Sequence, residues 1–239
     1  MFSKVTLIVS VCLTCISNAW VPDSSKLFWN KDFTIEFGYT FSLVSMYKLN
    51  KYYIDDFAKP FGILDKNFHF CTFWSPEVGL VFTNNIISFA YQRSDMILKG
   101  IPQKDFFGGY STPNLYVSFW GFSGTFRRVK ELKKILLSFG GTVLIGKSYA
   151  DVADNFFHEL AKSENRLNEG LGGGGSLFTE FNYVFLKYFL LSTRLSANVI
   201  LTETLKNKDS GKWVVDENNH EINLDYSGIS LGFRFGLIL

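Results

Sequence analysis

Cysteine, charge and long apolar runs are all scarce in this sequence. Only three Cys occur in 239 residues, and Lys+Arg 24 against Asp+Glu 22 gives a net charge of +2. Because the basic and acidic residues nearly cancel, the chain lacks the basic surface that a nucleic-acid-binding protein needs. Beyond the N-terminus, no apolar run approaches the roughly 20 residues of a membrane-spanning helix. These scarcities exclude a disulfide-rich scaffold, a nucleic-acid partner and a helical membrane protein.

Apolar and aromatic residues are nevertheless abundant. The chain is 47% hydrophobic and 18% aromatic, with 26 Phe, yet its mean hydropathy is only +0.10. A chain this rich in aromatic residues is not intrinsically disordered. The hydrophobic residues must therefore be dispersed along the chain.

The N-terminus has the features of a secretory signal peptide. Lys4 precedes an apolar stretch over 5–16, and Ser17 and Ala19 provide small residues for cleavage before Trp20. We expect residues 1–19 to be removed and 20–239 to form one mature domain. Cys12 and Cys15 would leave with the signal, so Cys71 alone remains. Lipid attachment at Cys15 is an alternative, although the usual Leu and small residue before such a Cys are missing.

Alternation of apolar and small polar residues runs through most of the mature chain. Between 228 and 239, apolar residues from Ile229 to Leu239 alternate with Gly, Ser and Arg, and the segment 33–43 repeats the pattern. Such period-two alternation predicts strands with two unlike faces. Eight strands are predicted, at 33–43, 68–82, 86–93, 113–126, 135–149, 176–185, 189–203 and 222–239.

The connections between these strands alternate in length. Gaps at 44–67, 94–112, 150–175 and 204–221 are long, whereas those at 83–85, 127–134 and 186–188 are short. Long loops on one side and tight turns on the other are typical of a membrane barrel. The fold class expected is therefore all-β: an eight-stranded antiparallel up-and-down transmembrane β-barrel, with both mature ends on the short-turn side.

The polar face of the strands distinguishes this barrel from a soluble one. A soluble barrel would carry many Lys and Glu outside, whereas this face is mostly Gly, Ser, Thr and Asn, which suit a narrow lumen. A soluble ligand-binding barrel and a β-sandwich are the structural alternatives. Nine charged residues fall in the predicted strands: Glu36, Glu77, Arg93, Lys147, Glu180, Arg194, Glu203, Asp225 and Arg234.

The closing strand, from Gly228 to Leu239, resembles that of small eight-stranded outer-membrane barrels of double-membraned bacteria. The resemblance covers nearly the whole mature chain and is architectural. It implies an outer-membrane location, contact with outer-membrane lipid and insertion by the barrel-assembly machinery. Leu239 stands where such proteins usually end in Phe.

Five of the strand charges share the inward phase: Glu36, Glu77, Glu180, Arg194 and Arg234. Because buried charges require partners, we expect a Glu–Arg network in the lumen. It would act as a structural plug or, alternatively, as the gate of a narrow pore for small solutes.

No catalytic residue, metal site or cofactor is expected. An outer-membrane acyl hydrolase or acyltransferase is the enzyme alternative, and His69, predicted to face the lumen, is its candidate residue. His158 and His220 fall in long loops, and no Ser is linked to any of the three by a motif.

Several segments depart from regular strands. Pro76 predicts a bulge or a later strand start, and shifts of the apolar phase predict bulges in 113–126 and near Gly228. The segment 150–169 is predicted to be helical, and the glycines of 170–176 a flexible hinge. A polar tip at 206–212 would be solvated or would bind an extracellular ligand, and we expect the protein to have a structural or surface-interaction role through its long loops.

Overall fold

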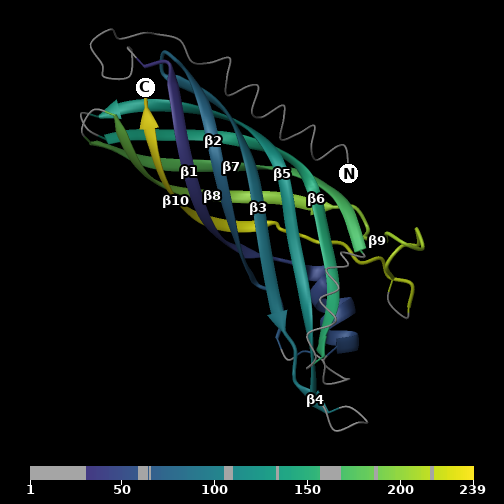
Figure 1. The fold of residues 1–239 in the computed structure, drawn as a ribbon. Coiled ribbons are helices and arrows are strands. Elements are labelled where there is room, and N and C mark those ends of the chain that lie inside the picture. Colours follow the sequence, from purple (N-terminus) through teal and green to yellow (C-terminus); the bar gives the residue numbers. More distant parts are fainter. Residues whose placement is uncertain are drawn as a thin grey trace.

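The computed structural model describes residues 31–58, 64, 66–104, 110–132, 135–156, 168–185, 188–215 and 218–239. The predicted signal peptide and His158 lie outside these residues. Eight long antiparallel strands form a closed barrel, seen from the side in Figure 1. They are β1 (Phe33–Val44), β2 (Phe70–Phe82), β3 (Asn85–Lys99), β5 (Tyr110–Leu132), β6 (Ile135–Phe156), β7 (Asn168–Phe185), β8 (Phe189–Thr202) and β10 (Gly228–Ile238).

Each long strand pairs with the next one along the chain, and β1 closes the barrel by pairing with β10 from Thr34↔Ile238 to Val44↔Gly228. The predicted eight-stranded fold is therefore confirmed. Three short elements accompany the barrel: the π-type helix η2 (Leu49–Ala58), β4 (Gln103–Lys104) and β9 (Lys206–Asn207). The C-terminus lies at the short-turn end, opposite η2 and β4 (Figure 1).

Side chains alternate between lumen and exterior as the sequence pattern predicts. In β1, Phe33, Ile35 and Phe37 are exposed, whereas Thr34 and Glu36 are buried. Successive residues of a strand point to opposite faces, so the apolar set of each barrel strand covers the outside and the small polar set fills the inside.

The exterior is a band of exposed apolar side chains. On β6, every outward residue from Ile135 to Ile145 is apolar or Gly, and Lys147 follows. At about 3.4 Å per residue and a tilt near 45°, this run rises roughly 25 Å. Ile145 is 70% exposed, and Phe89 on β3 is 67% exposed. Burial against other parts of the described chain therefore does not explain these apolar residues.

Aromatic rings contact one another across neighbouring strands of this outer face. Trp74 on β2 packs against Tyr91 on β3, with ring centroids 5.5 Å apart, and Tyr91 packs against Phe122 on β5 at 5.7 Å. Near the short-turn end, Phe185 and Phe189 stack at 5.3 Å. Large rings thus stabilise the outer face at more than one level of the barrel.

The predicted bulge in 113–126 is wrong. β5 pairs without interruption with β6 from Ser111↔Phe156 to Leu132↔Ile135. Odd-numbered residues from Leu115 to Val129 face the lumen, including the buried Leu115, Val117 and Phe119. The apolar phase changes because the lumen itself becomes apolar towards the long loops, while the strand continues in register.

The other two predicted irregularities also have simple explanations. The register between β2 and β3 is the same on both sides of Pro76, because the pairs Trp74↔Arg93 and Glu77↔Ala90 belong to one register. Only the two pairs between them are missing. A proline lacks the N–H that such pairs require, so the ladder is interrupted without a bulge. Near Gly228, the final strand simply begins later than predicted, and the preceding Leu224 and Tyr226 are buried in the lumen.

Two predictions for the third long connection are corrected. Residues 150–156 belong to strand β6, so the part of the predicted helix that the structure describes is extended. The glycine run is also no hinge, because Gly172–Gly175 pair with both β6 and β8 inside β7. A Cβ on Gly174 would lie 1.9 Å from the Val199 carbonyl oxygen, and one on Gly146 would lie 2.6 Å from Cζ of Phe119. The glycines allow neighbouring backbone and a large lumen ring to approach closely.

β3, β5 and β6 extend further towards the long connections than the other strands. β5 and β6 hold 23 and 22 residues, against 12 in β1 and 11 in β10. The extended parts form a raised wall on one side of the barrel. Within the described part of the chain, no helix is long and apolar enough to span a membrane.

Candidate functional site

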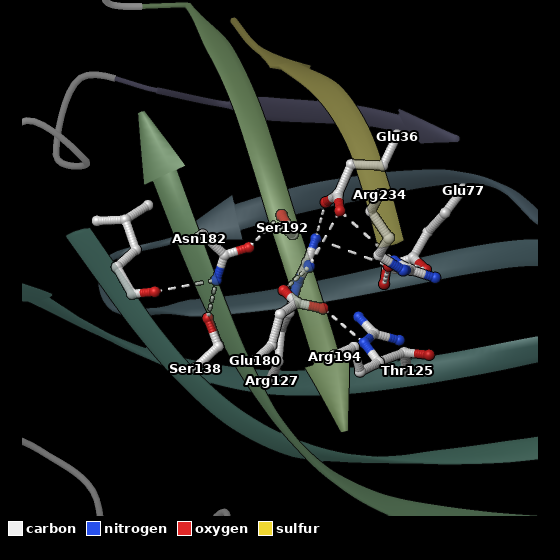
Figure 2. Close-up of polar contacts among 12 residues, drawn as sticks. Glu36, Glu77, Thr125, Arg127, Ser138, Glu180, Asn182, Ser192, Arg194 and Arg234 are labelled. Atoms are coloured by element: carbon white, nitrogen blue, oxygen red, sulfur yellow. Dashed lines mark hydrogen bonds and ion pairs between the residues drawn. The ribbon is translucent and has the colours of Figure 1, made fainter. Parts of the chain in front are cut away.

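Six charged side chains from six different strands meet inside the barrel. Glu36, Glu77, Glu180, Arg194 and Arg234, the five predicted lumen residues, come together with Arg127 of β5 (Figure 2). All six residues are buried, and Arg194 is the most exposed of them at 9%. We call these six residues the charged layer.

Arg127 is the centre of the charged layer. Its Nη1 lies 2.7 Å from Oε1 of Glu180, its Nη2 pairs with Glu36, and the same Nη2 lies 3.7 Å from Oε1 of Glu77. One guanidinium therefore contacts all three carboxylates. The planar fork of five N–H donors makes arginine suitable for such a role, which a lysine ammonium could not reproduce.

The other two arginines complete the pairing. Nη1 of Arg234 lies 2.5 Å from Oε2 of Glu77 and 3.4 Å from Oε2 of Glu36. Nε of Arg194 lies 2.5 Å from Oε2 of Glu180. Three negative and three positive groups thus cancel. Because isolated buried charges are very unfavourable, this set is tolerable only as a complete unit.

Neutral polar groups extend this network towards the short turns. The Ser88 hydroxyl donates to Oε1 of Glu77 at 2.5 Å. Asn182 donates to the Ser138 hydroxyl at 2.9 Å and accepts from the Ser192 hydroxyl at 2.5 Å (Figure 2). Short hydroxyl and amide side chains fit the narrow lumen and satisfy one another there.

An apolar basal cluster closes the short-turn end. It contains seven buried side chains contributed by β2, β3, β5, β6, β7, β8 and β10. They are Val81, Ile86, Val129, Leu136, Val184, Leu190 and Ile238.

A polar cavity of about 60 Å³ lies on the other side of the charged layer. Arg194 and Arg234 line it together with Gln92, Ser196 and Asn198. Nη2 of Arg194 has no hydrogen-bond partner among the described residues. A water molecule needs about 10–15 Å³ of such space and two to four polar partners. The cavity is therefore suited to a few ordered waters.

A larger apolar cluster, the apolar cap, closes the long-loop end. The described parts of the 45–69 and 203–227 connections fold over the lumen and pack against the inner face of the raised wall. The backbone N–H of Met46 donates to the Asp225 carbonyl at 2.8 Å, which joins the two connections. The cap contains Met46, Leu49, Ile54, Phe73, Leu115, Val117, Phe119, Leu144, Leu205, Ile222, Leu224 and Tyr226, among others.

Tyr226 is the principal anchor of the 203–227 connection. Its side chain is 1% exposed, and its ring centroid lies 5.4 Å from that of Phe119 and 6.0 Å from that of Phe73. Its hydroxyl donates to the Ser118 carbonyl at 3.4 Å. The apolar body packs in the cap while the phenol finds an acceptor, as buried tyrosines require.

Sequence reasoning missed Arg127, which it placed in the 127–134 turn. The signal was present: Gly121, Ser123 and Thr125 are small residues in the phase that leads to Arg127. Continuing this alternation for one more inward residue, from Thr125 to Arg127, would have placed Arg127 in the lumen.

The prediction that His69 faces the lumen is wrong, because its side chain is exposed. The acyl-hydrolase hypothesis depended on that position. His220 stacks on Tyr52 of η2, with ring centroids 4.4 Å apart. Among the described residues, no group of three His, Cys, Asp or Glu side chains could hold a metal ion.

Neither a protein-family model nor a curated protein matches this chain.

Proposed function

We propose that this protein is an integral outer-membrane barrel of a double-membraned bacterium, with a closed lumen and a working surface formed by its long connections. The observation that carries the proposal is the combination of a hydrogen-bonded closed sheet with an apolar exterior. In hydrocarbon every backbone N–H and C=O needs an internal partner, and a closed barrel supplies one for each. The band of roughly 25 Å on β6 is the height expected of such proteins.

The contents of the lumen favour a structural or surface-interaction role over transport. The basal cluster, the charged layer and the apolar cap follow one another along the lumen, and the polar cavity beside the charged layer measures about 60 Å³. The cap is fixed by backbone hydrogen bonds and buried rings, so it holds the 203–227 connection in a defined shape. Exposed Tyr47 and Trp213 on the capping connections offer contacts for an extracellular partner.

Membrane insertion is tested by refolding the urea-unfolded mature chain in the presence of phosphatidylcholine vesicles. We expect the protein to float with the vesicles and to migrate differently in detergent gels before and after heating. A chain that stays soluble and shows no such shift would contradict the proposal.

Two further measurements test the topology and the closed lumen. On intact cells, an external protease should cleave within Lys206–Lys212, where the tip is exposed. Protection of this tip until the cells are permeabilised would reverse the topology. In planar bilayers, the refolded protein should give no discrete conductance, and stepwise currents would support the gated-pore alternative.

A further inference from the structure

Arg127 and Arg128 are consecutive residues with opposite environments. Arg127 is buried in the charged layer, whereas Arg128 is outward-facing and partly exposed. Arg128 pairs with Asn85, the first residue of β3, and the next N–H, of Val129, donates to the Asn84 carbonyl at 2.7 Å. Arg128 therefore lies level with the β2–β3 turn, near the short-turn rim, and on its other side it pairs with Phe139, four residues after the start of β6.

The outward face of β5 changes from apolar to basic at this rim. Phe122 and Phe126 face outwards, and the next two outward positions are Arg128 and Lys130. A strand that carries lipid-facing rings and then cations on the same face places those cations at headgroup depth. Their long aliphatic stems can follow the apolar surface while the charged ends reach the phosphates.

Two outward cations towards the opposite rim, Arg93 and Lys147, are neutralised within the protein. Nε of Arg93 lies 2.5 Å from Oδ2 of Asp95, and Nζ of Lys147 lies 2.7 Å from Oε2 of Glu169. Arg128 and Lys130 have no ion pair or hydrogen bond to a side chain in the part of the chain described. Their charges are available to an external anion.

A further cation lies at the same rim, beside another strand. Nζ of Lys31, two residues before β1, lies 4.1 Å from the ring centroid of Tyr188, which is 50% exposed and directly precedes β8. An aromatic ring beside an ammonium group is typical of a membrane interface. Asp32 and Glu131 lie at the same rim, so its described part holds three cations (Lys31, Arg128 and Lys130) and two carboxylate side chains.

We infer that Arg128 and Lys130 bind the phosphate groups of anionic phospholipids in the leaflet at the short-turn side. The guanidinium of Arg128 can donate two parallel hydrogen bonds to one phosphate, and Lys130 adds a second charge on the same strand face. The inference rests on the proposed membrane location and names the lipid that this rim selects.

The test uses the mature chain refolded into vesicles of pure phosphatidylcholine and of phosphatidylcholine with one quarter phosphatidylglycerol. Spin-labelled lipids then report the relative association of the two headgroups with the barrel. Each cation near a lipid surface contributes about a fivefold preference for an anionic lipid. We expect wild type to prefer phosphatidylglycerol, R128Q/K130Q to lose about fivefold or more of that preference, and 0.5 M NaCl to weaken it.

The matched control is K99Q/K104Q, which removes two exposed cations from the long-loop side. It should keep the wild-type preference. Equal losses in both double variants, or none in R128Q/K130Q, would overturn the inference. Added inorganic phosphate at 10 mM should not displace the labelled lipid, and displacement would identify a free-phosphate site instead. A protein that inserts into neither type of vesicle would contradict the proposed membrane location. Insertion into both types without a preference for phosphatidylglycerol would contradict only the lipid site.

Discussion

Arg127 Nη1 lies 2.7 Å from Glu180 Oε1, and both side chains are almost completely buried. The pair joins β5 to β7, and the second contact of Arg127, with Glu36, joins β5 to β1. One guanidinium therefore links strands that are not neighbours in the sheet. Ladder hydrogen bonds close the wall of the barrel, and Arg127 closes its interior.

Arg127→Met should strongly destabilise the barrel. It removes one charge from a neutral set and leaves Glu36 and Glu180 without their central partner, and breaking a buried pair in this way costs about 3–5 kcal/mol. The measurement is the free energy of unfolding in urea, in zwitterionic detergent micelles. Arg128→Met, one residue away and partly exposed, is the matched control and should change it by less than about 0.5 kcal/mol.

Removing both partners should cost less than the two single losses together. E180Q/R127M restores the charge balance of the layer, so its loss of unfolding free energy should fall well below the sum of the single variants. Strict additivity would show that Arg127 and Glu180 do not act as a unit.

Much of this fold could be predicted from the sequence, because strand alternation depends only on the local pattern. The inward placement of Glu36 and Glu180 followed directly from it. The contents of the lumen near the long-loop end could not be predicted in the same way. Leu115, Val117 and Phe119 are apolar on the inward face, so in the sequence they look like a shift of the apolar alternation. Only the fold-back of Leu224 and Tyr226 onto them, a contact between residues more than 100 positions apart, explains why they face inwards.

The glycines of β7 were misread for a related reason. A glycine run without neighbours is flexible, but inside a sheet it marks close approach. Nothing in the local sequence indicates that Gly174 faces the Val199 carbonyl of the neighbouring strand β8. This contact depends on the register between β7 and β8, which cannot be read from the sequence of β7 alone.

Gly174→Ala should therefore destabilise the barrel although alanine is a small residue. Its Cβ would lie 1.9 Å from the Val199 carbonyl oxygen and 2.7 Å from Cα of Ile200, both backbone atoms that cannot rotate away. Overpacking of this kind costs about 1–3 kcal/mol. Gly124→Ala is the control, because the nearest atom to its Cβ, on Phe89, is 4.0 Å away. Unfolding in urea compares the two variants, and equal stability would contradict the close packing of β7 on β8.

A charge inside the outer apolar band should be tolerated only if the barrel is soluble. Val143→Lys places an ammonium group on the outward face of β6, where a membrane barrel would lose about 2–4 kcal/mol. Ile97→Lys, exposed on the raised wall beyond Asp95, should have little effect. The fraction inserted into phosphatidylcholine vesicles and the free energy of unfolding there give the answer. If Val143→Lys improves solubility in water without any loss of stability, the apolar band does not face lipid.

Tyr226→Ala should release the 203–227 connection while leaving the barrel closed. The substitution removes ring contacts with Phe119 and Phe73 from a fully buried position, a loss of about 3 kcal/mol. Because this loss falls on the cap, local opening should speed proteolysis at the Lys206–Lys212 tip more than it lowers the midpoint of global unfolding. Trp213→Ala, on the same connection but 49% exposed, should leave the cleavage rate unchanged. Planar-bilayer recordings of Tyr226→Ala should remain silent, since Arg127 and its three carboxylates still fill the lumen below the cap, and a new conductance in this variant would show that the cap alone keeps the barrel closed.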